Sequence, residues 1–313
     1  MKIIQPSFVI EEPREERGGM AMIEMAARTC YKSESGIREG SSERMVRMLI
    51  QHQHFAMLEH GSMIFFLDDK KKLENLEDAL RMIARVTGHH IRLNMTCENG
   101  RPIVSGNMRA WRELMESQTI TKYYFSPHID SAYLQWLVLD ESDDKSAVEL
   151  LGASLLTPLE QRVHRRQTVR FIIDRGVSHE FVRHRVMSFA MESTRYCNYS
   201  HGKFDGEITV IEPCFLEKDT DGYMLWETHC RSSEWAYFRM LDYGLQPQEA
   251  RSVLPHSIKT ELVMTGTLGE WDHFFDLRAK QKTGPAHPQA VEVAVPLMEE
   301  MKRRFPDVFG RGE

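Results

Sequence analysis

The residues with the most evident chemistry lie between Arg183 and Tyr196, where the sequence reads RHRVMSFAMESTRY. This segment holds three arginines, one histidine and three serine or threonine hydroxyls. Arginine stays charged at any working pH, and its planar fork matches the oxygens of a phosphate. A loop through Ser193, Thr194 and Arg195 can add backbone N–H groups that point at an anion. The pattern favours a phosphorylated ligand, in particular a nucleotide, over the alternative of a solvated basic turn.

Regular elements are predicted on both sides of this segment, and they must hold it in place. A strand over 167–174 and a short helix over 178–183 precede it, and the stretch up to Ser200 is predicted to be irregular. The other strands are predicted at 2–10, 62–67, 208–211 and 259–265. The other helices are predicted at 20–31, 41–53 with Ser41 or Ser42 as the cap, 221–243, 248–254, 270–280 and from His287 onward.

The order of these elements predicts the fold class. Strands and helices interleave without regular strand–helix–strand spacing and without a GxGxxG motif, so a doubly wound sheet is not favoured. We expect an α+β fold, with a mixed or antiparallel sheet as the core and helices around it. Residues 1–313 are expected to form one domain. The more polar residues 68–165 are predicted to be a mostly helical insertion, with helices through Arg85 and over 107–115 and a loop at 142–144.

Composition sets the broad class of protein. Of 313 residues, 42% are hydrophobic and 27% are charged, which is typical of a folded globular chain. The net charge of −6 weighs against binding to nucleic acid or anionic membrane through the overall field. No apolar run approaches the ~20 residues of a membrane span, and the N-terminus lacks the apolar core of a signal peptide. Five cysteines without a CxxC pair argue against a disulfide framework, so a cytoplasmic location is expected.

The sequence also resembles a known family, the flavin-dependent thymidylate synthases. Their signature is RHR, seven further residues, Ser, a variable residue and Arg-Tyr, and the segment from Arg183 to Tyr196 reproduces it. Four other blocks of the family also occur, in the family's order along the chain. Two precede this segment, Ala26-Ala27-Arg28 and Glu59-His60, and two come after it, Ala250-Arg251 with Pro255 and His273-Phe274 with Leu277-Arg278. The resemblance covers most of residues 20–67 and 167–295.

The resemblance implies a reductive methylation of dUMP to dTMP. Methylenetetrahydrofolate would be the carbon donor, FAD the hydride carrier and NADPH the reductant. It also implies a homotetramer whose active sites lie between subunits, with small molecules rather than nucleic acid or membrane as partners. No protein nucleophile and no metal are needed for this route.

The resemblance also implies a role for individual residues. The FAD contacts would be His60, Ser62, Arg183, His184, Arg185, Thr267, Gly269 and His273. The dUMP contacts would be Glu180, Arg183, Met191, Glu192, Ser193, Thr194, Arg195, Arg251 and Arg278. Arg278 is the expected catalytic residue, because a fixed cation beside the uracil ring stabilises the anionic form of the ring. Its neighbours Phe274 and Leu277 predict an apolar setting, in which the cation acts more strongly.

Several positions depart from the family pattern. Glu180 stands where Gln is usual, and Ala190-Met191 replace a common Asn-Glu pair, with Glu192 one place later. Thr267 and Gly269 stand where Asn and Arg are usual. These changes leave the arginines that would face phosphate in place, but they alter individual contacts to flavin and uracil.

A cysteine-nucleophile pyrimidine methyltransferase is the nearest chemical alternative. Pro213-Cys214 is similar to the Pro-Cys dipeptide of an unrelated thymidylate synthase family, whose thiolate attacks C6 of uracil. The rest of that family's pattern is missing from this sequence, so a structural cysteine is favoured for Cys214.

Two further alternatives use the basic and histidine-rich segments. A metal could be held by His52, His54 and His60, or by Cys197 with His201, but neither set has a known ligand spacing. A nucleic-acid-binding protein could use Arg162–Arg166 together with the RHR segment. For Arg162–Arg166 itself, a solvated turn before the strand at 167–174 is the preferred interpretation.

Overall fold

The computed structural model describes residues 1–12, 18–67, 70–117, 148–150, 155–200, 204 and 206–310. The loop predicted at 142–144 and the predicted metal partner His201 lie outside these ranges. Sheets and helices are mixed along the chain, which confirms the α+β class. None of the helices in the described ranges has the length and apolar character needed to cross a membrane.

The central sheet has four strands in the order β2-β7-β10-β8, and every neighbouring pair is antiparallel. Its strands are β2 (Ser7–Glu11), β7 (Arg166–Asp174), β10 (Lys259–Thr267) and β8 (Ser188–Met191). The pairing of β7 with β10 is the longest, running from Asp174 opposite Lys259 to Arg166 opposite Thr267. Except for the half-buried Lys259 at its start, every residue of β10 is buried, with the apolar residues Leu262–Met264 at the middle of the strand and buried polar residues on either side of them.

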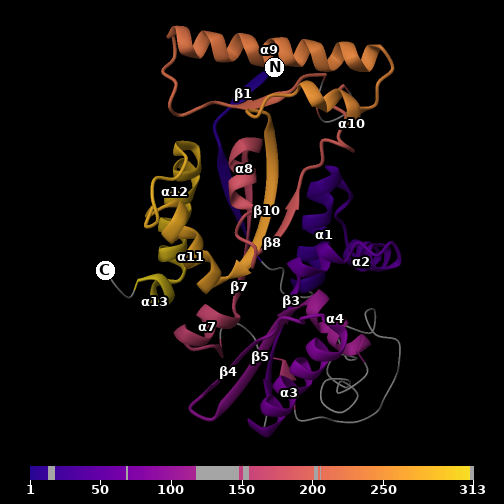
Figure 1. Ribbon diagram of the computed structural model, residues 1–313, viewed down its shortest axis with the longest axis vertical. Helices are drawn as coiled ribbons and strands as arrows, with labels where there is room; N and C mark the ends of the chain where they lie inside the picture. The colour runs from indigo at the N-terminus through magenta and orange to yellow at the C-terminus, as the bar shows by residue number, and fades with distance from the viewer. Residues whose placement is uncertain are drawn as a thin grey trace.

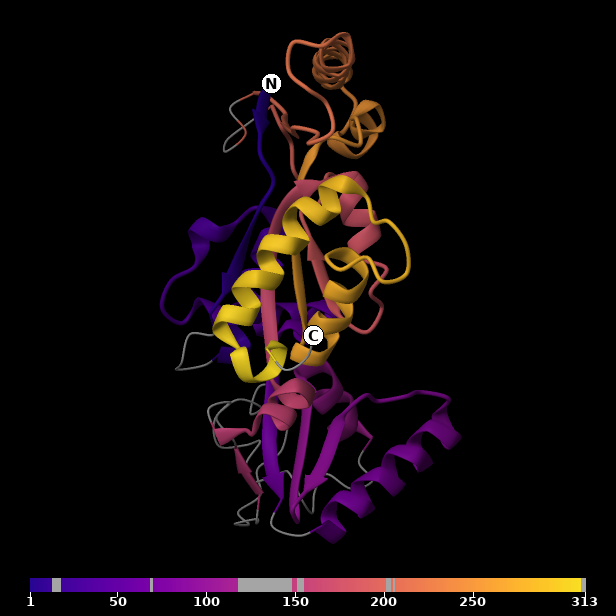
Figure 2. The same ribbon diagram turned by 90° about the vertical axis from the view of Figure 1, so that its left-hand side faces the viewer.

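Helices cover both faces of the central sheet (Figures 1 and 2). On one face, Leu262 and Met264 of β10 pack in a large apolar core with side chains from three helices. These helices are α8 (Arg175–Phe181), α11 (Leu268–Arg278) and α12 (Pro288–Arg304). On the other face, Val263 contacts Ala26 of α1 (Gly18–Tyr31).

The remaining elements lie above and below the central sheet in Figure 1. Above it, α9 (Asp221–Asp242) lies across the parallel pair β1 (Lys2–Ile4) and β9 (Thr209–Ile211), next to α10 (Pro247–Ala250). Below it, a second antiparallel sheet has the order β4-β5-β3-β6. Its strands are β4 (Asn94–Glu98), β5 (Arg101–Asn107), β3 (Ser62–Leu67) and β6 (Val148–Leu150). The other helices are α2 (Ser41–Gln51), α3 (Lys70–Thr87), α4 (Met108–Glu116), α7 (Pro158–His164), α13 (Pro306–Phe309) and 3-10 turns at Glu34–Gly36, Phe55–His60 and Arg251–Val253.

The structure corrects two predictions of secondary structure. The predicted insertion contributes β4, β5 and β6, which pair with or beside β3, in addition to its helices. Pro102 and Gly106 in β5 are turn-type residues, and the strand pairing prevails over them. The stretch after 183, predicted to be irregular, contains β8, which pairs with β10. The division into one domain with an insertion at 68–165 stays a prediction.

The cap of α2 also differs from the prediction. Gly40, with a φ of 68°, is the N-cap, and no side chain caps the helix. The Ser41 Oγ instead lies 2.9 Å from the Glu24 carboxylate and 2.6 Å from the Arg38 carbonyl, and it can donate its proton to either. Ser41 is therefore the first helical residue, held by contacts with α1 and with the preceding loop.

The packing of β10 predicts a large difference between two leucine truncations. Leu262 is fully buried in the core between the sheet and α11, whereas Leu225 on α9 is 72% exposed. Leu262→Ala should lower the free energy of unfolding by about 2–5 kcal/mol, because it removes apolar contacts and leaves a cavity. Leu225→Ala, the matched control, should change it by less than ~0.5 kcal/mol. Urea denaturation midpoints compare the two variants, and equal midpoints would contradict the burial of β10 at the centre of the sheet.

Candidate functional site

A tight junction joins the start of α8 to the start of β10. Asp174 ends β7 and caps α8, its side chain accepting a hydrogen bond from the Val177 backbone N–H at 2.8 Å. The next backbone N–H, that of Arg175, donates to the carbonyls of His256 and Ile258, each at 3.1 Å. The junction therefore fixes the segment before β10 against the first turn of α8.

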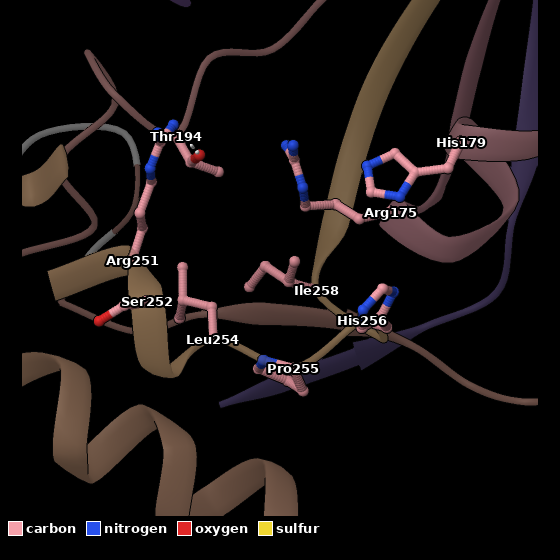
Figure 3. Close-up of a pocket in the computed structure, with 9 residues that line it drawn as sticks. All are labelled: Arg175, His179, Thr194, Arg251, Ser252, Leu254, Pro255, His256 and Ile258. Carbon is pink, nitrogen blue, oxygen red and sulfur yellow. Dashed lines mark hydrogen bonds between the residues drawn. The ribbon is translucent and has the colours of Figure 1, made fainter. Parts of the chain in front are cut away.

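A pocket of about 290 Å³ lies at this junction (Figure 3). Its lining comes from α8, from the loop after β8 and from the segment before β10: Arg175, His179, Thr194, Arg251, Ser252, Leu254, Pro255, His256 and Ile258. Two guanidinium groups and two imidazoles line the pocket, and none of the lining residues is acidic. An uncompensated set of cationic and hydrogen-bonding groups suits an anionic ligand.

The loop after β8 supplies one wall of this pocket. The backbone N–H groups of Glu192 and Ser193 donate to the carbonyls of Glu261 and Cys30, at 2.8 and 3.1 Å. Thr194 then faces the pocket, where its Oγ1 accepts a hydrogen bond from Arg251 Nη1 at 3.3 Å. The loop is thus fixed at its base, and its hydroxyl-bearing tip faces the ligand space.

Glu192 lies inside the protein rather than in the pocket. Its carboxylate is buried and pairs with Lys259 Nζ at 2.7 Å. Lys259 also pairs with Glu261 at 2.8 Å, and the neighbouring lysines hold the pKa of Glu261 down at about 2 against the opposing effect of burial. The structure therefore places Glu192 as an anchor of the loop, whereas the resemblance implied a direct nucleotide contact. Met191, also implied in that site, is the last residue of β8 and pairs with Leu262.

Arg195 lies outside the residues that line the pocket. Its side chain is exposed, lies over the Tyr196 ring at 5.3 Å and donates from Nε to the Gln248 side chain at 3.1 Å. Its backbone N–H donates to Ser193 Oγ at 3.3 Å. Arg195 is therefore available to a ligand from the outer side of the loop.

Arg278 belongs to a second group of residues. Its Nη1 donates to the Glu180 carboxylate at 2.8 Å, its Nη2 to the Glu180 carbonyl at 3.0 Å and its Nε to His184 Nε2 at 3.3 Å. Burial and the nearby charge of Arg278 lower the pKa of His184 to about 4, so this ring is neutral at pH 7 and accepts the hydrogen bond. Arg278 is thus an oriented cation in an ion pair, and the purely apolar setting predicted from Phe274 and Leu277 is wrong.

The lengths of two helices explain why Glu180 and Arg278 meet. A nine-residue strand such as β7 spans about 30 Å. Helix α8 leaves one end of the β7–β10 pair, and α11 leaves the other end, where Thr267 caps it in a capping box with Glu270. Helices of seven and eleven residues cover about 10 and 16 Å, so their C-terminal ends approach each other along the strands. His179 and Glu180 are consecutive on α8, and they face the pocket and Arg278 respectively.

Several residues implied in FAD binding lie around this second group. His184 is buried against Phe274, with ring centroids 5.0 Å apart, and the exposed His273 lies 6.1 Å from His184. Arg183 and Arg185 are exposed, and neither side chain has a hydrogen bond or an ion pair within the described residues. Two free guanidinium groups beside the neutral ring of His184 suit the pyrophosphate and ring atoms of FAD.

His60, at the end of the 3-10 turn Phe55–His60, lies at a separate place, against Thr265 of β10 in the central sheet. Its Nδ1 is 2.8 Å from Thr265 Oγ1, which is in turn 2.8 Å from Thr168 Oγ1. Its Nε2 is buried and lacks a partner, as do Nε and Nη1 of the nearby Arg166. Burial, together with the charge of Arg166, lowers the pKa of His60 to about 4. Buried polar atoms without partners are costly, so this place fits a bound group that supplies hydrogen-bond partners.

The other three residues implied in FAD binding have structural roles in the chain. Ser62 begins β3 and pairs with Asn107 of β5. Thr267 uses its hydroxyl to cap α11. At Gly269 a Cβ atom would lie 3.0 Å from the Arg162 carbonyl, so glycine allows α7 to approach α11 closely.

The residues of the alternative sites that the structure describes have other surroundings than those sites need. His164 is fully buried between Thr96 and Ser105, and Arg162 pairs with Asp272, so the interpretation of 162–166 as a solvated turn is wrong. Within the described residues no group of three or more His, Cys, Asp or Glu side chains is placed to hold a metal. Burial, with Glu292 nearby, raises the pKa of the Cys214 thiol, which disfavours a thiolate there.

Sequence reasoning missed three residues of the pocket, namely Arg175, His179 and His256. Each lies next to a feature that the sequence had already marked, namely the end of a predicted strand, a predicted site residue or a proline. Arg175 follows the end of a predicted strand, His179 precedes Glu180, and His256 follows Pro255. Their charge and position next to these signals could have raised them as candidates.

The fold and the pocket define an α+β protein with an arginine-lined site for an anion, and comparisons with known proteins give the family. The sequence model of the family described as "Thymidylate synthase complementing protein" matches residues 135–307. Because this match covers more than half of the chain, the protein belongs to that family. The resemblance to flavin-dependent thymidylate synthases is thereby confirmed.

Curated relatives carry the name "Flavin-dependent thymidylate synthase". The one from Pyrococcus furiosus is 32% identical over 130 residues, which are 42% of this chain and 51% of the relative. The one from Corynebacterium efficiens is 29% identical over 153 residues, or 44% of this chain and 58% of the relative. The chain therefore spans about half the length of the curated relatives it matches.

A solved structure of a UMP/dUMP methylase, PolB from Streptomyces cacaoi, is also similar. It covers 99% of this chain and 96% of its own, with 14% identity and a TM-score of 0.43.

The buried histidines predict a loss of stability in mild acid. The pKa values of His60, His164 and His184 are each lowered to about 4, mainly by burial, from the ordinary 6.5. Between about pH 6.5 and pH 4 the unfolded chain therefore binds protons that the folded protein does not. The free energy of unfolding should fall with pH there, by up to ~1.4 kcal/mol per pH unit for each histidine.

Urea denaturation at pH 7, 6 and 5 measures this slope. His164→Gln removes one of the three groups and should flatten the slope relative to the parent protein. His229→Gln, on the exposed face of α9, is the control and should keep the parent slope. A His164→Gln slope equal to that of the parent would show that His164 does not stay neutral in the folded protein.

Proposed function

We propose that the protein is a flavin-dependent thymidylate synthase that converts dUMP to dTMP. Methylenetetrahydrofolate would supply the carbon, and NADPH would be the reductant of the flavin. The observation that carries the proposal is the pocket in which Thr194 and Arg251, both from family blocks, meet without any acidic lining residue. Family membership supports the reaction class.

The nucleotide phosphate is assigned to the pocket. Arg251 presents a guanidinium whose protein partner is the neutral Thr194 hydroxyl, so its charge is free for an anion. Arg195 and Ser193 can add donors from the outer side of the loop. Each contact between a guanidinium and a phosphate is charge-assisted, and such hydrogen bonds are the strong ones.

Arg278 is assigned to the uracil ring. A guanidinium has five N–H donors, and the contacts with Glu180 and His184 use three of them. Two donors therefore remain for a carbonyl oxygen of the base. The same contacts fix the plane of the guanidinium, so the cation is oriented before substrate binds, as electrostatic stabilisation of a developing anion requires.

FAD is assigned to the residues around the second group and behind the sheet. The free guanidiniums of Arg183 and Arg185, the neutral ring of His184 and the unpartnered atoms of His60 and Arg166 fit its phosphates and ring atoms. When bound, FAD would supply the hydride that reduces the transferred one-carbon unit to a methyl group. The chain itself would hold the nucleotide, polarise the base through Arg278 and exclude water from the buried faces.

We also propose a cytoplasmic homotetramer with active sites between subunits. Five free cysteines fit a reducing compartment. Trp235 and Tyr243 are large apolar side chains exposed on or just after α9, and burial in a subunit interface would remove them from water.

One purification and one assay test the function. The purified protein should show a flavin absorbance spectrum and should form dTMP from dUMP when methylenetetrahydrofolate and NADPH are supplied. The double variant His184→Ala/Arg185→Ala should release flavin while keeping the circular dichroism of the parent, because it removes a buried ring and a free guanidinium from the flavin site. Full flavin retention by this variant would overturn the assignment of these residues, and absence of dTMP from a flavin-loaded protein would overturn the function.

Two further variants separate the flavin route from a cysteine nucleophile. Arg278→Lys keeps the charge but loses the planar fork, so it should slow oxidation of reduced flavin at saturating dUMP and methylenetetrahydrofolate. Cys214→Ala should retain most dTMP formation, since no thiolate attack is proposed. Single-turnover stopped-flow absorbance measures the first variant and product assays the second. Parent-like oxidation by Arg278→Lys would leave Arg278 as a binding residue only, and a loss of ~10⁴-fold in Cys214→Ala would support the cysteine mechanism.

A further inference from the structure

Half of the anion pocket is built by residues that neither the family blocks nor the proposed nucleotide contacts include. Figure 3 shows Thr194 and Arg251 on one side and His179 and His256 on the other. The Arg175 side chain extends between them, with its guanidinium toward Thr194 and Arg251. Within the described residues, this guanidinium has no hydrogen-bond or ion-pair partner.

Backbone hydrogen bonds and a ring contact hold these three residues at one place in the fold. The backbone N–H groups of Arg175 and Gly176 donate to the His256 carbonyl, at 3.1 and 3.4 Å, so His256 cannot move independently of α8. The His179 and His256 rings lie edge to face, with centroids 6.0 Å apart and planes at 90°. The two imidazoles thus lie together on one wall of the cavity, and the Arg175 backbone is held at the same junction.

The charges around this wall favour an anion in the pocket. His179 is faced by Arg175 on its own helix, by Arg183 after that helix and by His256, all of which oppose its protonation. Asp174, whose charge favours protonation of His179, is buried, and one of its oxygens accepts the Val177 backbone N–H. Glu180, the next residue on α8, pairs with Arg278. Burial and these cations lower the pKa of His179 below its ordinary value. A phosphate dianion bound beside His179 would favour the protonated imidazole and so counteract the effect of these cations.

We propose that Arg175, His179 and His256 form an anion subsite that grips the phosphate of a nucleotide opposite Arg251 and Thr194. The subsite takes up a proton on His179 when the phosphate binds. It rests on the proposed function for the identity of the nucleotide, dUMP, and it adds specificity for a phosphorylated ligand over a nucleoside.

The direction of the pH dependence follows from this arrangement. A group that binds a proton together with the ligand makes affinity rise as pH falls toward its pKa in the complex. The phosphate itself titrates with a second pKa near 6, which would obscure the effect below that pH. Inorganic sulfate keeps its charge throughout this range, so it reports the protein groups alone.

Isothermal titration calorimetry of the flavin-loaded protein tests the subsite. The ligands are dUMP, deoxyuridine and inorganic sulfate, at pH 6 to 8 and in two buffers of different ionisation enthalpy. For the parent protein, sulfate should bind more tightly as pH falls, and the buffer comparison should show net proton uptake. The double variant His179→Gln/His256→Gln should lose both the pH dependence and the proton uptake.

The role of Arg175 is tested by comparing how its substitution changes the affinities for dUMP and for deoxyuridine. Arg175→Ala should weaken dUMP at least about tenfold, because it removes charge-assisted hydrogen bonds, and should leave deoxyuridine unchanged. Arg175→Lys keeps the charge but loses the planar guanidinium, so its affinity for dUMP should lie between those of the parent and Arg175→Ala. Arg231→Ala and His229→Gln, both exposed on α9, are the matched controls and should bind all three ligands as the parent does.

The outcomes separate this proposal from the function on which it rests. If the parent binds dUMP but the Arg175 and histidine variants bind it equally well, the subsite is wrong and the function stands. If the parent binds sulfate with the expected pH dependence but does not bind dUMP, the subsite stands and the proposed substrate is wrong. Equal effects of Arg175→Ala on dUMP and deoxyuridine would also overturn the subsite, because they would indicate a general loss of structure.

Discussion

The antiparallel pairing of β7 with β10 is the interaction on which the rest of the structure depends. Nine consecutive residue pairs fix the register, so the two ends of this ribbon are fixed relative to each other. At one end Asp174 starts α8, and at the other Thr267 starts α11. A shift of one residue would move every side chain of β10 to the opposite face of the sheet and would separate both helices from their partners.

A buried ionic network reinforces this pairing on the face covered by α1. Glu261 of β10 accepts from Lys32, Lys259 and Arg170, at 2.5, 2.8 and 3.2 Å. Lys259 also holds Glu192 at the base of the loop that carries Thr194. Removing one partner of such a network leaves an uncompensated buried charge, which typically costs ~3–5 kcal/mol. The network therefore links the stability of the central sheet to the position of the ligand-binding loop.

The two groups of the site differ in how their cations are balanced. Arg175 and Arg251 have no acidic partner among the described residues, and they are the ones that line the pocket. Arg278, by contrast, is paired with Glu180 and contacts a neutral His184. An unpaired guanidinium favours binding of a full negative charge, whereas a paired and oriented one can polarise a neutral ring without attracting an anion to itself. One helix, α8, carries residues of both groups and so sets their separation.

The sequence by itself determined the elements whose signals are local, and with them the family. Strand β3, the long helix α9 ending before Gly244, and the strand–helix pairs β7–α8 and β10–α11 were predictable, because alternation, caps and glycine act within a few residues of the chain. The RHR block and the later arginine blocks identified the chemistry, because residue type and spacing are visible without coordinates.

Only the tertiary structure showed strands β4, β5 and β8, which exist through pairing with distant partners. It alone brought Arg175, His179 and His256 to Thr194, turned Glu192 inward to Lys259 and joined Glu180 to Arg278 across 98 residues. Such contacts depend on strand register and helix length, which no single segment of the sequence contains.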